Sequence, residues 1–270
     1  MEKQRIKIVV AGAAGRMGKA ILDLAHRDRE IEIAGAFEKA DHPMTGKTVG
    51  VLIGVDSIQV PIDSDIAKTI AKGDVVIDFT HSDVTPKIFE TVLSMRKAVV
   101  IGTTGLQQKF IEQLSLASKT IPIVQAPNMS IGVNLLFRLA SMVGEVLDDR
   151  YDVEIVEEHH RHKKDAPSGT ALELARLIAK ARKINLDEKA IYGRHGMTGE
   201  RSQGTIGVHA VRGGDTVGYH QVCFLTEGER VELVHRATSR NAFAAGALKA
   251  AKFLADKKSG FFNMQQVLGL

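Results

Sequence analysis

The first half of the sequence alternates short apolar runs with longer amphipathic stretches, and this alternation limits the possible folds more than any other feature. Runs rich in Val and Ile, separated by helical patterns of roughly 10–15 residues, are typical of parallel β-α-β units whose sheet is covered by helices on both faces. The expected strands cover residues 6–12, 31–37, 74–80, 98–104 and 121–127, and the expected helices cover residues 15–28, 84–97 and 106–119. We therefore predict an α/β fold with a Rossmann-like, doubly wound parallel sheet.

After residue 127 the pattern changes to that of a second, differently built domain. The expected elements are helices at 130–147 and 171–182 and strands at 151–160, 204–212, 216–226 and 230–237. Three strand patterns in a row favour an antiparallel arrangement, and the "GGD" at 213–215 predicts a hairpin between the first two. The sequence therefore predicts a second α+β domain with a mixed, mainly antiparallel sheet.

The last helical pattern, residues 242–256, is rich in small residues. Small side chains allow close packing, so we expect this helix to return to the first domain. The first domain then comprises residues 1–127 and 241–270, and the second comprises residues 128–240. A chain of 270 residues is long enough for two domains.

The composition argues against several classes of protein. The single cysteine, Cys223, allows neither a disulfide framework nor a multi-cysteine zinc site. The net charge is only +4 and Trp is absent, so we expect no surface for nucleic acid. No window approaches the ~18 apolar residues of a membrane span, and the first residues lack a signal-like apolar run. We expect a cytoplasmic protein that binds neither nucleic acid nor membranes.

The stretch "GAAGRMG", residues 12–18, lies where the first strand meets the first helix. Gly12 permits a tight turn, Gly15 lets the backbone approach a pyrophosphate, and Gly18 lets helix and strand pack closely. Glu38 ends the second strand, where a carboxylate accepts hydrogen bonds from an adenosine ribose. These residues predict a dinucleotide site on the first domain, the alternative being glycines that only form a turn.

Two further motifs end strands of the same sheet, "DFTHSD" at 78–83 and "GTTG" at 102–105. Ligands of open α/β sheets bind beyond the carboxyl ends of the strands. The candidates to line the nicotinamide side of a dinucleotide are Phe79, Thr80, Gly102 and Thr104. The alternative is that these are ordinary turn residues.

The stretch "EEHHRHKKDAPSGTA", residues 157–171, gathers histidines, lysines and carboxylates just before a helix. A metal site is disfavoured, because on an extended chain His159 faces away from His160 and His162 and the zinc-protease spacing is absent. Two interpretations remain, a solvated charged loop and an acid/base site for an anionic substrate.

The residues that follow favour the acid/base site. Gly169 and Thr170 open a helix whose first-turn amides can bind an anion, and Lys163 adds positive charge. His159 can change its protonation near neutral pH and so act as acid or base. Together with a hydride donor on the first domain, these groups suit the reduction of an unsaturated acid.

The motifs taken together resemble the bacterial 4-hydroxy-tetrahydrodipicolinate reductase (dihydrodipicolinate reductase) family. The resemblance spans nearly the whole chain and rests on "VAGAAGRMG", "DFT", "GTTG", "APNMSIGVN", "EEHHRHKKDAPSGTA" and "GFFNMQQVLGL". It implies NAD(P)H-dependent reduction of a cyclic unsaturated dicarboxylate, 4-hydroxy-tetrahydrodipicolinate, to tetrahydrodipicolinate in the diaminopimelate route to lysine. It also implies a homotetramer formed through the second domain's sheet and closure of the two domains over the substrate.

The resemblance also implies roles for individual residues. His159 matches the acid/base histidine, Lys163 the proton donor, and His160, Gly169 and Thr170 the contacts to the substrate carboxylates. The residues that match cofactor contacts are Gly12, Ala13, Ala14, Gly15, Arg16, Met17, Glu38, Gly102, Thr103, Thr104, Ala126, Pro127, Asn128 and Met129. Two positions depart from the family: Met129 stands where an aromatic residue is common, and Lys39 where an arginine often follows the acid.

The pair Glu38 and Lys39 bears on the choice of cofactor. Glu38 favours NADH, because its carboxylate can accept hydrogen bonds from a free ribose and repels a 2′-phosphate. Lys39 offers a positive charge to that phosphate, though without the planar fork of arginine. We therefore expect the protein to use both NADH and NADPH, with Lys39 contributing to NADPH binding.

Two other functions fit parts of this pattern. One is a different dehydrogenase of amino-acid metabolism on the same scaffold, such as an aspartate-type dehydrogenase, which needs no second carboxylate site. The other is a nucleotide-sensing regulatory protein without turnover. An assay with the cyclic dicarboxylate separates both from the reductase.

Overall fold

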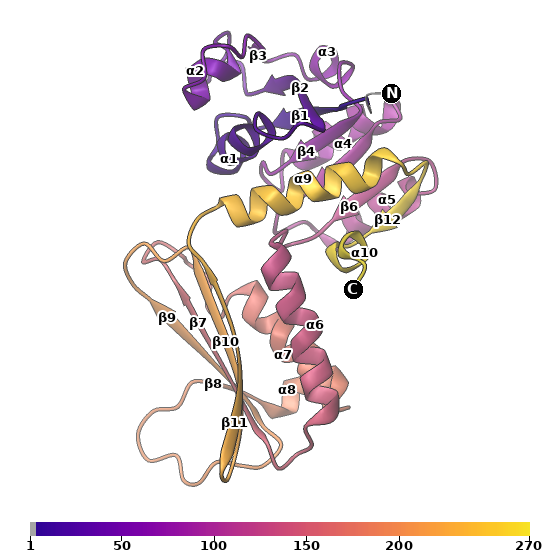
Figure 1. Ribbon diagram of the computed structural model, residues 1–270. Helices are drawn as coiled ribbons and strands as arrows, with labels where there is room; N and C mark the ends of the chain where they lie inside the picture. The colour runs from indigo at the N-terminus through magenta and orange to yellow at the C-terminus, as the bar shows by residue number, and fades with distance from the viewer. Residues whose placement is uncertain (1–3) are drawn as a thin grey trace. The chain divides into compact units, whose positions relative to one another are not determined.

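The computed structural model describes residues 4–270, which form two compact units. Unit 1 comprises the chain up to Ile131 together with Arg240–Leu270, and unit 2 is the continuous segment Gly132–Ser239. Figure 1 shows the yellow C-terminal helix of unit 1 alongside the indigo and magenta elements from the start of the chain. Unit 1 is therefore discontinuous in sequence, with unit 2 inserted into it.

Unit 1 is built on a seven-stranded sheet in the order β12-β6-β5-β4-β1-β2-β3, in which every neighbouring pair is parallel. Its strands are β1 (Ile6–Ala11), β2 (Ile31–Phe37), β3 (Ile62–Asp63), β4 (Val75–Asp78), β5 (Ala98–Ile101), β6 (Pro122–Gln125) and β12 (Gly260–Phe262). Its helices are α1 (Arg16–Ala25), α2 (Val49–Ile53), α3 (Ile66–Ile70), α4 (Thr85–Ser94), α5 (Gln108–Ala117), α9 (Asn241–Ala255) and α10 (Met264–Leu268). The predicted Rossmann-like parallel sheet is confirmed, although the short elements α2, β3, α3, β12 and α10 were not predicted.

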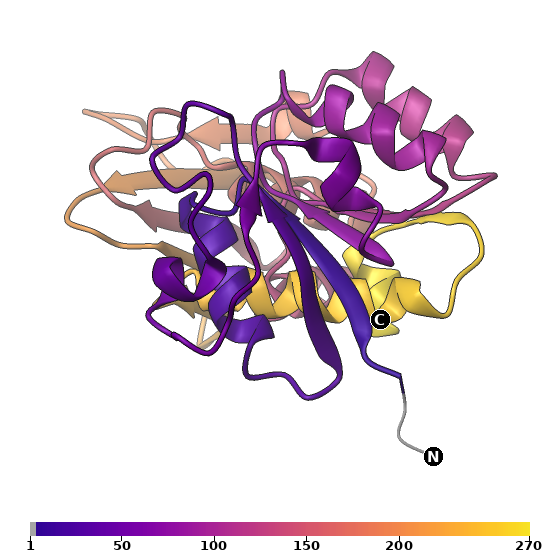
Figure 2. The ribbon, with the colours of Figure 1, turned by 90° about the horizontal axis from the view of Figure 1, so that it is seen from above.

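Alternate residues of the central strands of unit 1 enter two separate apolar cores. In β1, Ile8 and Val10 join side chains of α1 and α9, whereas Val9 and Ala11 join side chains of α4 and α5. Figure 2 shows the yellow α9 on the opposite side of the sheet from the magenta helices. Successive side chains of a strand point to opposite faces, so a sheet that is covered on both sides requires strands that are apolar throughout.

Unit 2 is built on a five-stranded sheet in the order β11-β10-β7-β9-β8. Its strands are β7 (Asp152–His159), β8 (Ala190–Tyr192), β9 (Ile206–Arg212), β10 (Gly218–Thr226) and β11 (Glu229–Ala237), and its helices are α6 (Ile131–Val146), α7 (Gly169–Ala181) and α8 (Leu186–Lys189). Helices α6 and α7 cover one face of this sheet, where Phe137 and Ile178 share a core with Phe224. The predicted α+β domain with a mixed sheet is confirmed, but the sheet is not mainly antiparallel, because two of its four strand pairings are antiparallel and two are parallel.

The predicted hairpin between residues 204–212 and 216–226 is wrong. These segments are β9 and β10, and β7 lies between them, parallel to β9 and antiparallel to β10. Instead β10 and β11 form a hairpin around Glu227 and Gly228, where Gly228 has a φ of 89°. The "GGD" loop crosses the end of β7, and the amide of Gly213 donates a hydrogen bond to the carbonyl of His159 at 3.1 Å. This loop therefore supports the segment in which the histidine motif begins.

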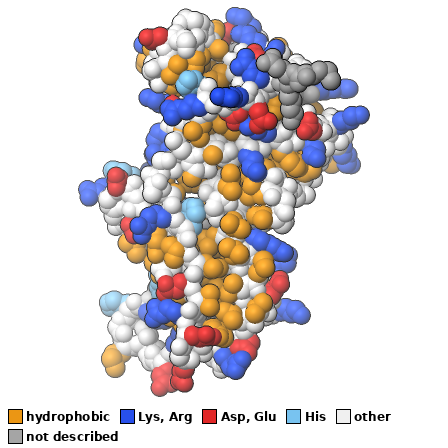
Figure 3. All heavy atoms as spheres, viewed as in Figure 1, with side chains coloured by type: hydrophobic (Ala, Val, Ile, Leu, Met, Phe, Trp, Pro, Cys, Tyr) orange, Lys and Arg blue, Asp and Glu red, His pale blue; other side chains and the backbone are white. Residues whose placement is uncertain are grey.

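Helix α6 exposes an apolar stripe on the face that does not pack on the sheet. The side chains of the stripe are spaced to lie on one face of a helix, and all are at least 37% exposed: Ile131, Leu135, Leu139, Met142 and Val146. Figure 3 shows apolar side chains gathered over this helix. Although α6 is rich in apolar residues, neither it nor any other helix within residues 4–270 has the length and apolarity needed to cross a bilayer.

Candidate active site

The turn between β1 and α1 requires glycine at two positions. Gly12 has a φ of +63°, and a Cβ atom on it would lie 2.9 Å from Cγ2 of Thr80. A Cβ atom on Gly18 would overlap the backbone oxygens of Gly12 and Ala13. Gly15 is exposed, and a Cβ atom there would approach only the Gly12 oxygen. The turn is thus closed on its inner side and open at the first-turn amides of α1, as a phosphate site requires.

Glu38 follows β2 and reaches this glycine turn. Its Oε1 accepts a hydrogen bond from the amide of Ala14 at 3.0 Å, and its Oε2 accepts one from the amide of Lys39 at 3.3 Å. The half-buried carboxylate therefore lies beside the turn, where it can accept hydrogen bonds from ribose hydroxyls. The side chain of Lys39 is exposed.

The other predicted cofactor residues end neighbouring strands of the same sheet. Phe79 and Thr80 follow β4, Gly102–Thr104 follow β5, and Ala126–Met129 follow β6. The strand order places β6, β5, β4 and β1 side by side and parallel. These turns and the glycine turn therefore share one edge of the sheet, which we call the carboxyl edge.

Some predicted cofactor contacts have side chains that point into the protein. A Cβ atom on Gly102 would overlap the ring of Phe79, so these two residues pack against each other. The side chains that are at most 5% exposed are those of Ala13, Thr103, Ala126 and Met129. These four residues can therefore contact a ligand only through their backbone groups. The open amides, the carboxylate of Glu38 and the row of strand-end turns fit a dinucleotide.

In unit 2 a buried carboxylate, Glu157, holds the first histidine of the second motif. Glu157 is 0% exposed and lies two residues before His159 on β7, so both side chains point to the same face of the strand. Nδ1 of His159 lies 2.6 Å from Oε2 of Glu157. Arg212, the last residue of β9, donates to both oxygens of this carboxylate at 2.7 and 2.8 Å. The imidazole is thus oriented with Nδ1 against Glu157, which leaves Nε2 for proton transfer.

Glu157 is ionised despite its burial. Burial by itself raises the pKa of the carboxyl group, but hydrogen bonds from His159, Arg212 and the amide of Ser168 outweigh this effect and lower the pKa of Glu157 to about 2. A carboxylate in this position favours the tautomer with a proton on Nδ1. It also stabilises the imidazolium that forms when Nε2 takes up a proton.

Helix α7 begins directly beside this pair. Ser168 caps the helix: its Oγ accepts a hydrogen bond from the amide of Ala171 at 3.2 Å, and its own amide donates to Oε1 of Glu157 at 2.9 Å. The amide of Gly169 stands in the first turn, where no acceptor within the helix is in reach. The positive end of the helix dipole favours an anion here. Glu157 therefore connects His159 directly to the start of α7.

A second imidazole, that of His220, lies against the first. The two ring centroids are 5.2 Å apart, and Nε2 of His220 lies 3.2 Å from Oγ of Ser168. Burial, assisted by the nearby His159, lowers the pKa of His220 to about 3. His220 is thus neutral at ordinary pH and packs beside His159 without adding a charge.

Lys163 lies in the loop between β7 and α7, where it pairs with Asp165. Its Nζ donates to the two carboxylate oxygens of Asp165 at 2.8 and 2.9 Å, and this interaction lowers the pKa of Asp165. The loop is tied to the sheet, because the amide of His160 donates to the carbonyl of Thr216 and Arg212 donates to the carbonyl of Asp165, each at 2.8 Å. A substrate carboxylate that binds Lys163 must compete with Asp165.

The five residues predicted for substrate binding and catalysis, 159, 160, 163, 169 and 170, lie at one end of unit 2. The residues that support them were not predicted from the sequence: Glu157, Asp165, Ser168, Arg212 and His220. The strand pattern carries a signal for Glu157, because Val153, Ile155 and Glu157 alternate on one buried face of β7. A carboxylate that continues an apolar face indicates a buried partner.

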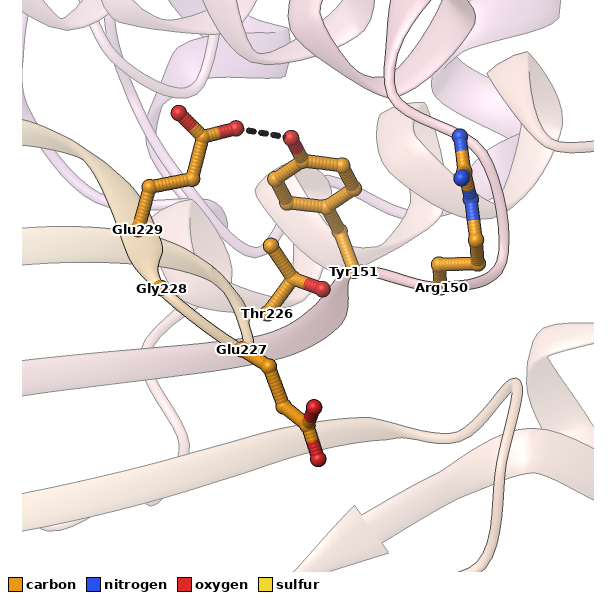
Figure 4. A pocket seen from close by; sticks show the side chains of 6 residues that line it. All are labelled: Arg150, Tyr151, Thr226, Glu227, Gly228 and Glu229. Atoms are coloured by element: carbon orange, nitrogen blue, oxygen red, sulfur yellow. Dashed lines mark hydrogen bonds between the residues drawn. The ribbon is translucent and has the colours of Figure 1, made fainter.

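A polar hollow lies at the opposite end of the unit 2 sheet. Figure 4 shows the hydroxyl of Tyr151 directed at Glu229 within it. The side chains around the hollow are those of Arg150, Tyr151, Thr226, Glu227, Gly228 and Glu229. Since β7 begins next to Tyr151 and ends at His159, about 23 Å of strand separate the two places. The hollow is therefore separate from the candidate site.

Metal ligation finds no support in the described part of the chain. Among residues 4–270 no group of three or more His, Cys, Asp and Glu side chains is arranged to hold a metal ion. Of the histidines of the motif, His159 instead contacts the carboxylate of Glu157.

Two family models match the chain. Dihydrodipicolinate reductase, N-terminus, matches residues 6–129, and Dihydrodipicolinate reductase, C-terminus, matches residues 132–268. The 4-hydroxy-tetrahydrodipicolinate reductase of Magnetococcus marinus is 47% identical over 264 residues, and that of Syntrophus aciditrophicus is 45% identical over 264 residues. Each alignment covers 98% of this chain and 98% of the relative.

A solved structure agrees with these matches. The dipicolinate-bound dihydrodipicolinate reductase from Paenisporosarcina sp. TG-14 aligns with a TM-score of 0.75 at 25% identity, covering 97% of this chain and 99% of that one. Reductases of this kind with a Rossmann-like sheet use a nicotinamide dinucleotide, for which the carboxyl edge of unit 1 provides fitting residues. The full-length similarity and the matches to both family models show that the chain belongs to the dihydrodipicolinate reductase family.

Proposed function

We propose that this protein reduces 4-hydroxy-tetrahydrodipicolinate to tetrahydrodipicolinate with a nicotinamide dinucleotide, as a step of lysine biosynthesis through diaminopimelate. The observation that carries the proposal is the assembly at one end of unit 2, where an oriented histidine, a lysine and the start of α7 lie together. The curated relatives bear the name of this activity.

A cyclic dicarboxylate suits this assembly because two anionic groups need two sets of donors. The first turn of α7, with Gly169 and Thr170, offers amides and a hydroxyl to one carboxylate. Lys163 and His160, in the loop tied down by Arg212, offer donors to the other. The Paenisporosarcina reductase was solved with dipicolinate, a planar dicarboxylate, which supports a site of this kind.

The conversion removes the 4-hydroxyl group of the substrate as water, and reduction of the ring double bond that results adds one hydride and one proton. The nicotinamide supplies the hydride when it is bound. In our proposal His159 or Lys163 donates the proton. Glu157 fixes the imidazole of His159 and stabilises its cationic form, while Asp165 keeps the ammonium of Lys163 in the loop until a substrate carboxylate displaces it.

The cofactor site follows from the carboxyl edge of unit 1. The amides of the glycine turn bind the pyrophosphate, and Glu38 accepts hydrogen bonds from the adenosine ribose. Lys39 is exposed one residue further on, and its charge attracts a 2′-phosphate that Glu38 repels. The protein accordingly uses both NADH and NADPH without a strong preference.

Two further expectations from the sequence remain predictions. One is a homotetramer formed through unit 2, which gel filtration with light scattering tests. The other is a cytoplasmic location, which fractionation of cells tests.

A steady-state assay with the cyclic dicarboxylate and either cofactor tests the proposed activity. His159→Ala and Lys163→Ala should each lower kcat by ~10²–10⁴, the usual loss when a general acid is removed. NADH binding, followed by its own fluorescence, should survive in both. Lys164→Ala is a matched control, because this neighbouring lysine is exposed and outside the network. Normal turnover in both test variants contradicts the assignment, and no turnover in the unmodified protein contradicts the proposed function.

A further inference from the structure

Asp78 ends β4 in the middle of the carboxyl edge and is 1% exposed. Its Oδ1 accepts hydrogen bonds from the amide of Thr80 at 2.8 Å and from the hydroxyl of Thr80 at 2.6 Å. The hydroxyl of Thr103 lies 3.5 Å from the same oxygen. A single buried oxygen atom thus connects the turn after β4 with the turn after β5.

The contacts of Asp78 extend to a third turn. The methyl group of Thr80 stands against the Cα of Gly12, because a Cβ atom on Gly12 would lie 2.9 Å from it. On the other side, the hydroxyl of Thr103 accepts a hydrogen bond from Thr85 at 2.9 Å, and the amide of Gly102 donates to the backbone carbonyl of Asp78 at 2.9 Å. The turns after β1, β4 and β5 are therefore all fixed through one residue.

We propose that Asp78 is a positioning residue for the nicotinamide dinucleotide site: from beneath the carboxyl edge it sets the relative positions of the glycine turn, the "DFT" turn and the "GTTG" turn. Asp78 acts through Thr80 and Thr103 and does not itself contact the cofactor. This inference rests on the proposed cofactor site, whose residues lie on these same three turns.

The partners of Asp78 indicate why a carboxyl group stands here. An apolar residue would leave the amide of Thr80 and two hydroxyls without their acceptor, and a buried donor without an acceptor is costly. None of these partners is charged, and Oδ2 of Asp78 has no hydrogen-bond partner among residues 4–270. Burial raises the pKa of Asp78 against the lowering effect of its hydrogen bonds from Thr80. Asparagine has the same shape and keeps an accepting oxygen, so it should replace Asp78 functionally.

The first test is hydrogen exchange on the cofactor-free protein. Asp78→Ala should speed the exchange of amides in all three turns, whereas Asp78→Asn should leave their exchange near that of the unmodified protein. Thr69→Val is the control: Thr69 is a fully buried threonine of unit 1, and its hydroxyl donates to the carbonyl of Asp65, which lies in none of the three turns. Unchanged exchange in the three turns of Asp78→Ala overturns the proposal.

The second test is the dissociation constant for NADH, measured by the fluorescence of the bound nucleotide. Asp78→Ala should raise it roughly tenfold or more, because small displacements of positioning groups are expensive. Asp78→Asn and Thr69→Val should bind NADH like the unmodified protein. Equal weakening in Asp78→Asn and Asp78→Ala overturns the proposal, because the carboxyl charge would then be what matters.

The two tests separate this inference from the proposed function. If the unmodified protein fails to bind NADH, the proposed cofactor site is wrong, while the exchange experiment still decides whether Asp78 orders the three turns. If Asp78→Ala does not fold, Thr103→Val removes one hydroxyl from the network and keeps the shape of the side chain. In Thr103→Val, faster amide exchange confined to the turns after β4 and β5 supports the proposal for these two turns. Unchanged amide exchange in both turns overturns it.

Discussion

Two carboxyl groups, Glu157 of unit 2 and Asp78 of unit 1, have almost no exposed surface and lie near the carboxyl ends of central strands, yet they have opposite electrostatic surroundings. Glu157 accepts hydrogen bonds from Arg212 and lies against His159. Within residues 4–270, Asp78 accepts hydrogen bonds only from threonine hydroxyls and an amide. Hydrogen bonds overcome burial and lower the pKa of Glu157 to about 2, whereas burial raises the pKa of Asp78.

This difference shows that burial does not by itself decide the charge of a carboxyl group. A buried carboxylate needs a cation or several strong donors to offset the loss of water, and only Glu157 has them. Glu157 therefore places a negative charge beside His159, while Asp78 holds the turns after β4 and β5 together through hydrogen bonds. Variants that change charge without changing shape should separate the two roles.

The largest effect is expected from Glu157→Gln, which keeps the shape and removes the charge. Without the carboxylate, the cationic form of His159 loses its stabilisation and the ring loses its fixed tautomer, so kcat should fall by at least ~10². The same carboxyl-to-amide change at the other site, Asp78→Asn, should leave kcat near that of the unmodified protein. Steady-state kinetics on both variants measures the contrast.

Glu154→Gln provides the control for this prediction. Glu154 also lies on β7, and interactions with Arg194, His209 and Arg201 outweigh burial to lower its pKa to about 2. Its side chain points to the opposite face of the strand from His159. A kcat loss in Glu154→Gln as large as that in Glu157→Gln would mean that the effect comes from disturbing the strand and not from the histidine.

An intermediate effect is expected on the free energy of unfolding in mild acid. It arises because His220, beside Glu157, is held neutral in the folded protein. The pKa of His220 is lowered from its ordinary value of 6.5 to about 3, so below pH 6.5 the unfolded chain binds a proton that the folded chain does not. The free energy of unfolding therefore falls as the pH drops from 6.5 towards 3. Between pH 7 and pH 5 this contribution amounts to about 2 kcal/mol, and His220→Gln should remove it.

Tyrosine fluorescence during urea unfolding measures this effect in unit 2 alone. The chain has no Trp, and its three tyrosines, Tyr151, Tyr192 and Tyr219, all belong to unit 2. If His220→Gln and the unmodified protein lose the same stability between pH 7 and pH 5, then His220 is not held neutral by the fold.

The smallest effect is expected from a change at Lys39, which is exposed and follows a third, only half-buried carboxylate, that of Glu38. Water and salt screen charges at such a place, so Lys39→Ala should cost NADPH binding about 1 kcal/mol, roughly fivefold in KM. The KM for NADH should change little. Equal changes for both cofactors would show that Lys39 does not contact the 2′-phosphate.

The fold could be predicted from the sequence where local patterns determine it, and not where distant segments pair. The parallel sheet of unit 1 follows from its apolar runs, whereas the place of β7 between β9 and β10 depends on pairing across the whole of unit 2. The motif around His159 could be recognised, but the contact of Glu157 with Arg212 becomes visible only once β7 and β9 are paired. In the same way, Asp78 stands in a recognised motif, but its role depends on Thr103 in another turn.

Helix α9 has a consequence for the order in which the protein is made. It packs against β4, β5 and β6 and fills the same core as Ile8 and Val10, yet it is translated after the whole of unit 2. On the ribosome, unit 2 is complete and continuous while one face of the unit 1 sheet still lacks its cover, and domains fold as their segments emerge. Unit 1 therefore finishes folding last, although it begins first, and a nascent chain arrested before residue 241 exposes the apolar face on which α9 packs.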